Sequence, residues 1–187
     1  MSEMHEEKTY SIFQIAMNLT IACLISGIII AGTYYITNPS AVKNAELLVQ
    51  KSMQELVKDA DNFQPVDGKT DWYAAEKGGE IIAYVVPAES KGYGGAIKML
   101  VAVSKEGTVV DYSITSANET PGLGTNAAEE DFRSEFWGKT SDALIVVKDP
   151  TNTKNIQAMT GATISSRAVT KGVKEAVDEV VEFTEGK

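Results

Sequence analysis

Histidine and cysteine are almost absent from this chain of 187 residues. The single cysteine, Cys23, lies in an apolar stretch near the N-terminus, and the single histidine, His5, lies in the polar segment before it. The rest of the chain therefore lacks the ligands of the usual zinc sites and of haem with an axial histidine. It also lacks Cys-His nucleophiles and Ser-His-Asp triads, and one cysteine cannot form an internal disulfide. Any redox chemistry must then use an organic cofactor.

Positive charge is also scarce. The chain has 17 basic and 26 acidic residues, and its formal net charge is -9. A nucleic-acid partner is not expected, because the phosphate backbone is bound by basic faces. The length leaves room for one domain of ordinary size with its own core beside the apolar stretch.

One long apolar run is present. No charged residue occurs from Thr9 to Val42, and the most apolar part extends from about Ile12 to Ile36. As a helix this part would be roughly 37 Å long, which exceeds the hydrocarbon core of about 30 Å. A cleaved signal peptide would have a shorter core and a small-residue cleavage site, and a lipid-modified Cys23 would stand at the end of the run. We therefore expect a retained single-span anchor over residues 1–37 and one domain over residues 38–187.

Periodicity and turn residues outline the elements of that domain. Asn38-Pro39-Ser40 is expected to end the span, with Ser40 capping a second helix over 41–60. Strands are expected at 71–74, 80–86, 96–104, 108–115 and 143–147, with a hairpin turn at 105–107. Helices are expected at 126–137, begun by a capping box of Asn126 and Glu129, and at 164–183. Hairpins combined with terminal helices predict an α+β fold.

The segment Met159-Thr160-Gly161-Ala162-Thr163-Ile164-Ser165-Ser166 carries the chemistry. Gly161 permits a sharp turn and a close approach of the backbone to a ligand. Thr163 precedes a strong helical pattern, so its hydroxyl lies at a helix N-terminus, where free N–H groups and the helix dipole favour phosphate. The alternative interpretation is that Thr163 only caps the helix.

Four motifs resemble one protein family. Thr160-Gly161-Ala162-Thr163 is similar to the [Ser/Thr]-Gly-Ala-Thr signature of the FMN-binding subunits of two related ion pumps. These are the G subunit of the Rnf complex and the C subunit of the sodium-pumping NADH:quinone oxidoreductase. The family's Gly-Tyr-Gly-Gly turn, Glu-Thr-Pro-Gly-Leu-Gly loop and Phe…Phe-x-Gly-Lys segment are matched at 92–95, 119–124 and 132–139. The motifs follow the family's order behind one N-terminal span, so the resemblance covers nearly the whole chain.

The resemblance implies the cofactor and its site. In the family the last threonine of the signature carries FMN through a phosphoester, which implies covalent attachment at Thr163. The glycine-bearing loop is expected to contact the flavin, and Lys148 is a candidate to offset the phosphate charge. The expected cofactor-binding residues are Thr163, Thr160, Gly161, Ala162, Glu119, Thr120, Leu123, Gly124 and Lys148. No catalytic acid-base set and no metal ligands are expected.

Some positions depart from these patterns or have competing interpretations. The family usually has an aspartate three residues before the signature, where this chain has Gln157. The spacing of the glycines at 122 and 124 matches the glycine pattern of a dinucleotide-binding motif. That motif requires a βαβ unit, but here the preceding strand belongs to a hairpin and no βαβ unit follows. We interpret Trp72, Tyr84 and Tyr93 as packing residues.

The resemblance also implies function and location. The chain is expected to relay electrons through FMN in a membrane ion-translocating ferredoxin oxidoreductase of the Rnf type, without turning over substrate alone. Its partners would be the other membrane and redox subunits and a flavin transferase that uses FAD. Charges beside the span weakly favour a cytoplasmic domain, whereas the resemblance implies a cell-membrane protein with its domain on the extracytoplasmic side.

Three alternatives remain open on the sequence. The chain is short and lacks extra insertions, which favours the Rnf subunit over the C subunit of the sodium-pumping NADH:quinone oxidoreductase. A stand-alone membrane-anchored flavoprotein is the second alternative. The third belongs to a different class, a flavin-free membrane-anchored scaffold in which Thr163 is only a cap.

Overall fold

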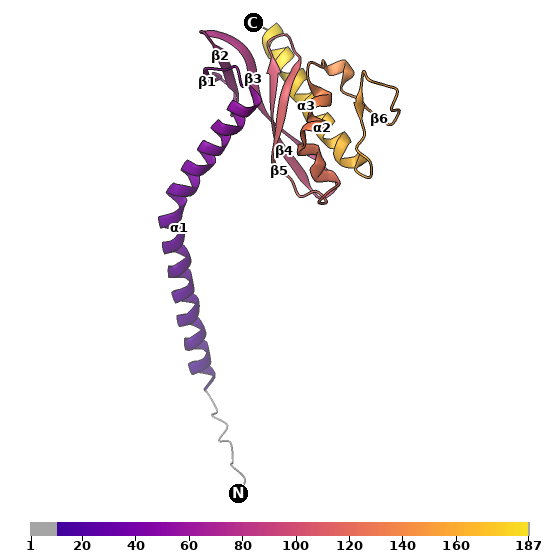
Figure 1. Cartoon of the computed structure of the whole chain (residues 1–187). Coiled ribbons are helices and arrows are strands. Elements are labelled where there is room, and N and C mark those ends of the chain that lie inside the picture. The colour runs from indigo at the N-terminus through magenta and orange to yellow at the C-terminus, as the bar shows by residue number, and fades with distance from the viewer. Residues whose placement is uncertain (1–10, 187) are drawn as a thin grey trace. The chain divides into compact units, whose positions relative to one another are not determined.

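A computed structural model describes residues 11–186 (Figure 1). The chain divides into two compact units, Met1–Leu48 and Val49–Lys187. Helix α1 (Ile12–Leu56) begins in the first unit and ends in the second. The predicted domain boundary between residues 37 and 38 stays a prediction.

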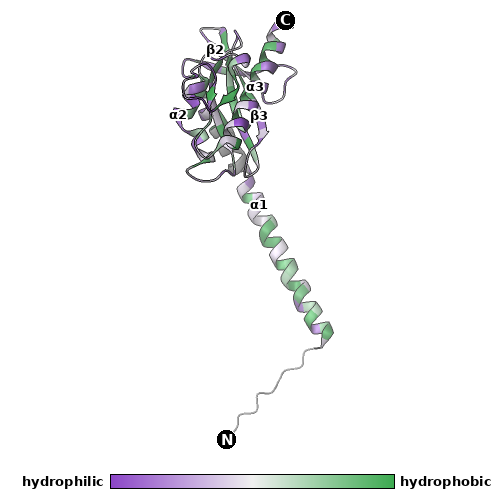
Figure 2. Ribbon diagram, turned by 90° about the vertical axis from the view of Figure 1, so that its right-hand side faces the viewer, coloured by the Kyte–Doolittle hydropathy of each residue, from purple (hydrophilic) through white to green (hydrophobic). Residues whose placement is uncertain are grey.

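The first part of α1 is long and apolar enough to cross a membrane. The segment Ile12–Asn38 has a mean hydropathy of 2.1, and none of the side chains in its most apolar window is buried. Figure 2 shows this length of helix as almost continuously hydrophobic. The hydroxyls of Thr20 and Thr33 donate hydrogen bonds to the carbonyls of Ala16 and Ile29, at 2.9 and 2.8 Å. These polar hydrogens are therefore satisfied within the helix, as an apolar surrounding requires.

The predicted helix break at Asn38-Pro39-Ser40 is wrong, because α1 continues through these residues to Leu56. A proline inside a helix removes one backbone hydrogen bond, but the bonds on either side of it can still carry the helix onward. Ser40 therefore caps no new helix. The end of α1 packs Met53 and Leu56 into an apolar cluster with Val85 and other buried residues of the sheet.

The second unit is built on a five-stranded antiparallel sheet with the strand order β1-β2-β3-β4-β5. The strands are β1 (Asn62–Pro65), β2 (Tyr73–Lys77), β3 (Glu80–Lys91), β4 (Ala96–Ser104) and β5 (Val109–Ser116). The predicted hairpin at 105–107 is confirmed, with Gly107 at φ 78° between β4 and β5. Strand β1 was not predicted, because Asn62–Pro65 is short, polar and mostly exposed.

Strand β3 extends beyond Val86, where Pro87 was expected to end it. Pairing with β2 stops at Val85, whereas pairing with β4 continues through Pro87 to Lys91. Pro87 therefore lies where β3 has a neighbouring strand on one side only, which is a position where a strand tolerates a residue without an N–H donor.

Helix α3 (Thr163–Glu185) covers one face of the sheet, as Figure 1 shows. The expected stripe of Val169, Val173, Val177 and Val180 is fully buried against residues of β3, β4 and β5. The helix end adds Phe183, whose ring lies edge-on to Trp72 and Tyr84 with centroids 5.5 and 5.7 Å apart. Trp72 and Tyr84 are buried packing residues, as predicted.

The helix predicted at 126–137 is instead three short pieces. A 3-10 turn at Gly124–Ala128 is followed by α2 (Glu130–Arg133) and a second 3-10 turn at Ser134–Phe136. The predicted capping box is wrong, because Glu129 is extended with ψ 149° and Asn126 Nδ2 donates to Gly122 O at 3.2 Å. The buried rings of Phe132 and Phe136 fix the segment against Tyr112.

A small parallel sheet carries the loop that leads into α3. Strand β6 (Val146–Val147) pairs with β7 (Ile156–Gln157). Only this part of the strand expected at 143–147 forms, because a 3-10 turn occupies Ser141–Ala143. Strand β6 leads directly to Lys148, and β7 is separated by two residues from the Thr160-Gly161-Ala162-Thr163 motif.

Candidate cofactor-binding site

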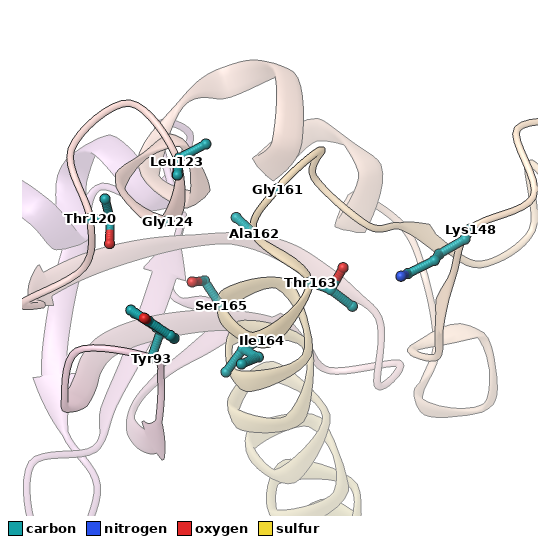
Figure 3. Close-up of a pocket in the computed structure, with 10 residues that line it drawn as sticks. All are labelled: Tyr93, Thr120, Leu123, Gly124, Lys148, Gly161, Ala162, Thr163, Ile164 and Ser165. Carbon is teal, nitrogen blue, oxygen red and sulfur yellow. The ribbon is translucent and has the colours of Figure 1, made fainter.

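A cavity of about 650 Å³ lies at the N-terminus of α3 (Figure 3). Four segments and the first turn of α3 form its walls: the turn before β4, the loop after β5, the segment after β6, and the loop between β7 and α3. The lining residues are Tyr93, Thr120, Leu123, Gly124, Lys148, Gly161, Ala162, Thr163, Ile164 and Ser165. Cavities of this volume hold cofactor-sized ligands.

Most of the predicted binding residues meet at this cavity. Two do not line it. Thr160 opens instead onto a neighbouring hollow of about 600 Å³ that also borders Glu135 and Gln157. Glu119 is 7% exposed and lies beneath the residues that line the cavity. The sequence prediction missed Tyr93, Ile164 and Ser165 as lining residues.

Thr163 is the first residue of α3, and Ala162 stands at the capping position. No side chain of residues 11–186 caps the first turn, and within these residues the hydroxyl of Thr163 has no hydrogen-bonding partner. The interpretation of Thr163 as a simple N-cap therefore does not hold. Its hydroxyl is available for chemistry at a helix end whose N–H groups favour an anion.

Ser166 holds the loop that presents Thr163. Its Oγ accepts a hydrogen bond from Met159 N at 3.0 Å and donates one to Ala162 O at 2.9 Å. Gly161 turns the chain at φ 76°, a conformation that favours glycine. The backbone around Thr163 is therefore set by buried hydrogen bonds that leave the Thr163 side chain unoccupied.

Lys148 is the one charged side chain among the described residues that line the cavity. In Figure 3 it reaches from the end of β6 toward Thr163, and its amine is directed at that side chain. A lysine and a helix N-terminus at the same end of a cavity form a favourable environment for phosphate.

Large apolar and aromatic side chains line the rest of the cavity, with Tyr93 and Leu123 on the side away from Lys148 and Ile164 beside Thr163 (Figure 3). Tyr93 is 70% exposed, Leu123 41% and Ile164 54%, so these large side chains are not covered by the domain itself. The interpretation of Tyr93 as a packing residue is wrong, because the turn at 92–95 leaves its side chain largely exposed. Flat apolar ligands suit such a surface.

Glu119 forms hydrogen bonds that connect the segments forming the cavity walls. Its Oε1 accepts a hydrogen bond from Gly94 N at 2.9 Å, and its Oε2 accepts one from Ser165 Oγ. Burial alone would raise the pKa of Glu119, but the hydrogen bonds from Ser165, Gly94 and Tyr93 outweigh burial and hold the pKa below its usual value. The carboxylate thus joins the turn before β4, the loop after β5 and the start of α3.

Gln157, at the position where the resemblance implied an aspartate, has a structural role of its own. Its Nε2 donates to the carbonyl oxygens of Asp149 and Asn152, at 2.6 and 2.7 Å. Its backbone N–H donates to Glu135 Oε2 at 2.5 Å. An aspartate has no donor for these two carbonyls, so the amide fits this loop better than a carboxylate would.

Comparison with known proteins assigns the family. A family model described as the FMN-binding domain matches residues 92–178, which include every wall of the cavity. The G subunit of the proton-translocating ferredoxin:NAD(+) oxidoreductase complex of Clostridium ljungdahlii is 64% identical over 177 residues, covering 95% of this chain and 96% of that protein. The chain belongs to the family of these G subunits.

Other relatives agree with this family. The corresponding protein of the Na(+)-translocating complex of Acetobacterium woodii is 30% identical, and the match covers 89% of this chain and 90% of that protein. The G subunit of an ion-translocating oxidoreductase complex of Methanosarcina acetivorans is 28% identical, with 90% and 94% covered. The family and the function class expected from the motifs are thereby confirmed.

Solved structures of similar fold confirm the predicted fold class. NqrC of Shewanella oneidensis has a TM-score of 0.53 at 18% identity, covering 70% of this chain and 74% of that one. The C subunit of the Na(+)-translocating NADH-quinone reductase of Parabacteroides distasonis has a TM-score of 0.51 at 23% identity, covering 60% and 61%.

Proposed function

We propose that this chain is the electron-transfer subunit of a membrane-bound, ion-translocating ferredoxin:NAD(+) oxidoreductase, and that it carries FMN as a phosphoester on Thr163. The observation that carries the proposal is the hydroxyl of Thr163. It has no hydrogen-bonding partner within residues 11–186, and it lies at a helix N-terminus inside a cavity of about 650 Å³.

The lining residues fit FMN at both ends. Lys148 and the first turn of α3 would hold the phosphate, while Tyr93, Leu123 and Ile164 would flank the ring system. FMN, when bound, supplies one- and two-electron transfer. The chain's own contribution is to position the ring and to hold it at the rim of the domain, where a partner can reach it.

A flavin transferase that uses FAD is the proposed source of the group. Thr163 Oγ would form a bond to the phosphorus on the FMN side of the FAD diphosphate, and the bond from that phosphorus to the bridging oxygen would break. AMP leaves, and the hydroxyl proton of Thr163 is released. The free hydroxyl of Thr163 and the amine of Lys148 that is directed toward it support Thr163 as the reacting residue.

The proposed location is the cell membrane, with a single span and the flavin domain on the extracytoplasmic side. The segment Ile12–Asn38 supports the span by its length and hydropathy. A covalent tether is useful on that side, because a dissociable cofactor would be lost where free FMN is scarce.

Co-purification tests the complex. We expect that mild detergent extraction from native membranes yields this chain together with several multi-span subunits and that the assembly oxidises reduced ferredoxin with NAD(+). Recovery of the chain alone, with its flavin present, would instead support a stand-alone flavoprotein. Recovery of a colourless chain would support the flavin-free scaffold.

A further inference from the structure

The hydroxyl of Ser165 has a fixed direction. Ser165 is 2% exposed, yet it belongs to the cavity lining, and Figure 3 shows its side chain on the side of Tyr93 and Thr120, away from Lys148. Its Oγ donates its proton to Glu119 Oε2, and an ionised carboxylate can only accept. Ser165 Oγ therefore has no proton left for a ligand and can offer only its lone pairs.

A second hydrogen bond fixes the position of the Glu119 carboxylate. Its other oxygen accepts the backbone N–H of Gly94 at 2.9 Å. A Cβ added to Gly124 would lie 2.7 Å from Glu119 Oε2 and 2.7 Å from Ser165 Oγ, so backbone encloses the pair closely. The backbone at Gly124 therefore closes one side of the pair.

We infer that Glu119 is a positioning residue that fixes Ser165 Oγ as a hydrogen-bond acceptor for an N–H or O–H group of the bound flavin. The inference rests on the proposed function. The ribityl hydroxyls and the ring N–H are such donors, whereas the phosphate offers none and belongs at the Lys148 end. The Glu119–Ser165 pair thereby sets the direction in which the flavin lies across the helix N-terminus.

The substitution Glu119→Gln would reverse the direction of the hydrogen bond between residues 119 and 165, with little change in the shape of the side chain. The amide oxygen of the new side chain can still accept from Gly94, which leaves the amide N–H groups to face Ser165 Oγ. The Ser165 hydroxyl would then accept from the amide and direct its own proton into the cavity. A flavin donor would meet a donor there, which costs a buried hydrogen bond.

The test measures reversible binding of riboflavin to the full-length Thr163→Val chain, monitored by quenching of flavin fluorescence. Riboflavin lacks phosphate, so its affinity reports on the Ser165 end of the cavity. We expect Glu119→Gln to weaken binding on the order of tenfold, and Ser165→Ala to weaken it similarly. In the Ser165→Ala background, Glu119→Gln should add little, because both substitutions remove the same contact.

Asp111→Asn is the matched control. Asp111 is a carboxylate of similar burial, 8% exposed, but it pairs with Arg133 outside the cavity. This variant should lose stability and keep the riboflavin affinity of its parent, and thermal unfolding would verify that every variant is folded at the binding temperature. If the Glu119→Gln variant does not fold, the riboflavin affinity of the Ser165→Ala variant alone decides whether the inference stands.

Several results would overturn the inference. One is an unchanged riboflavin affinity in the Ser165→Ala variant, and another is a loss of affinity from Glu119→Gln that is equal with or without Ser165. A loss of affinity in Asp111→Asn equal to that in Glu119→Gln would also overturn it. So would the absence of riboflavin binding by the Thr163→Val chain. These outcomes are distinct from failure of the proposed function, which would appear as a native wild-type chain without covalent flavin.

Discussion

Replacement of Thr163 by valine is expected to abolish covalent flavin and to leave the free energy of unfolding within about 0.5 kcal/mol of the wild-type value. Valine keeps the branched shape and a similar helix propensity, and it removes only the hydroxyl. Because that hydroxyl makes no hydrogen bond within residues 11–186, the fold loses nothing with it. In-gel flavin fluorescence of the denatured protein and denaturant unfolding in detergent measure the two quantities.

The same pair of measurements separates the two interpretations of Thr163. If the hydroxyl were an N-cap, its removal would cost about 1 kcal/mol and would leave any flavin in place. Thr163→Ser serves as the matched control, because it retains a hydroxyl at the same position and should keep the flavin. Fluorescence retained by the valine variant would rule out Thr163 as the attachment residue.

Replacement of Gly94 by alanine is expected to destabilise the domain by about 3 kcal/mol or more and to reduce flavin incorporation sharply. A Cβ on Gly94 would overlap the backbone carbonyl of Asn118, which no side-chain rotation can relieve. The turn before β4 would have to move away from the loop after β5, and the hydrogen bond from Gly94 N to Glu119 would break. Denaturant unfolding and flavin fluorescence per mole of protein report both effects.

Gly122→Ala is the control for this substitution. Gly122 lies in the adjacent loop at φ 72°, but a Cβ there would have no atom within 4 Å. Its cost should be limited to backbone strain of roughly 1–2 kcal/mol. Equal losses at Gly94 and Gly122 would show that the close packing around Glu119 is not what holds the cavity together.

Most residues of the cavity that the sequence identified lie in local motifs. Thr120, Leu123 and Gly124 come from one loop, and the segment 161–163 comes from another, so resemblance to the family found them as blocks. Ser165 was missed because its role depends on a hydrogen bond to Glu119, which is 46 positions away in the chain. The helical pattern that contains Ser165 gave no sign of this partner.

Tyr93 was missed for a different reason. Aromatic residues are usually buried, so packing was the ordinary expectation for it. The glycines on both sides of Tyr93 were the available signal, because they allow a turn that projects the ring. Only the structure decides whether such a ring lies over a cavity or under the sheet, and here it is 70% exposed at the cavity rim.

The fold was predictable wherever hydrophobic periodicity was strong. Strand β4 matches its predicted bounds, and α3 begins and ends within two residues of its predicted limits. The predictions failed where a proline was taken to end a helix or a strand. Pro39 does not end α1, and Pro87 does not end β3, because the surrounding backbone hydrogen bonds tolerate each proline.

The segment after β5 illustrates the same limit. Phe132 and Phe136 are buried as the helical pattern predicted, but the residues that bear them form short turns. The hydroxyl of Tyr112 donates to Ala127 O at 2.6 Å and fixes the first of these turns against β5. An interaction from a neighbouring strand thus overrides local helix propensity.

The most direct test of covalent flavin on Thr163 is the intact mass of this chain purified from its native membrane, with peptide mapping of the modification. We predict a mass increase of one FMN less one water, in-gel fluorescence, and localisation of the added mass to Thr163. An unmodified mass without fluorescence would contradict the proposed function and would support the flavin-free scaffold, while a modification on another residue would contradict the assignment of the cavity.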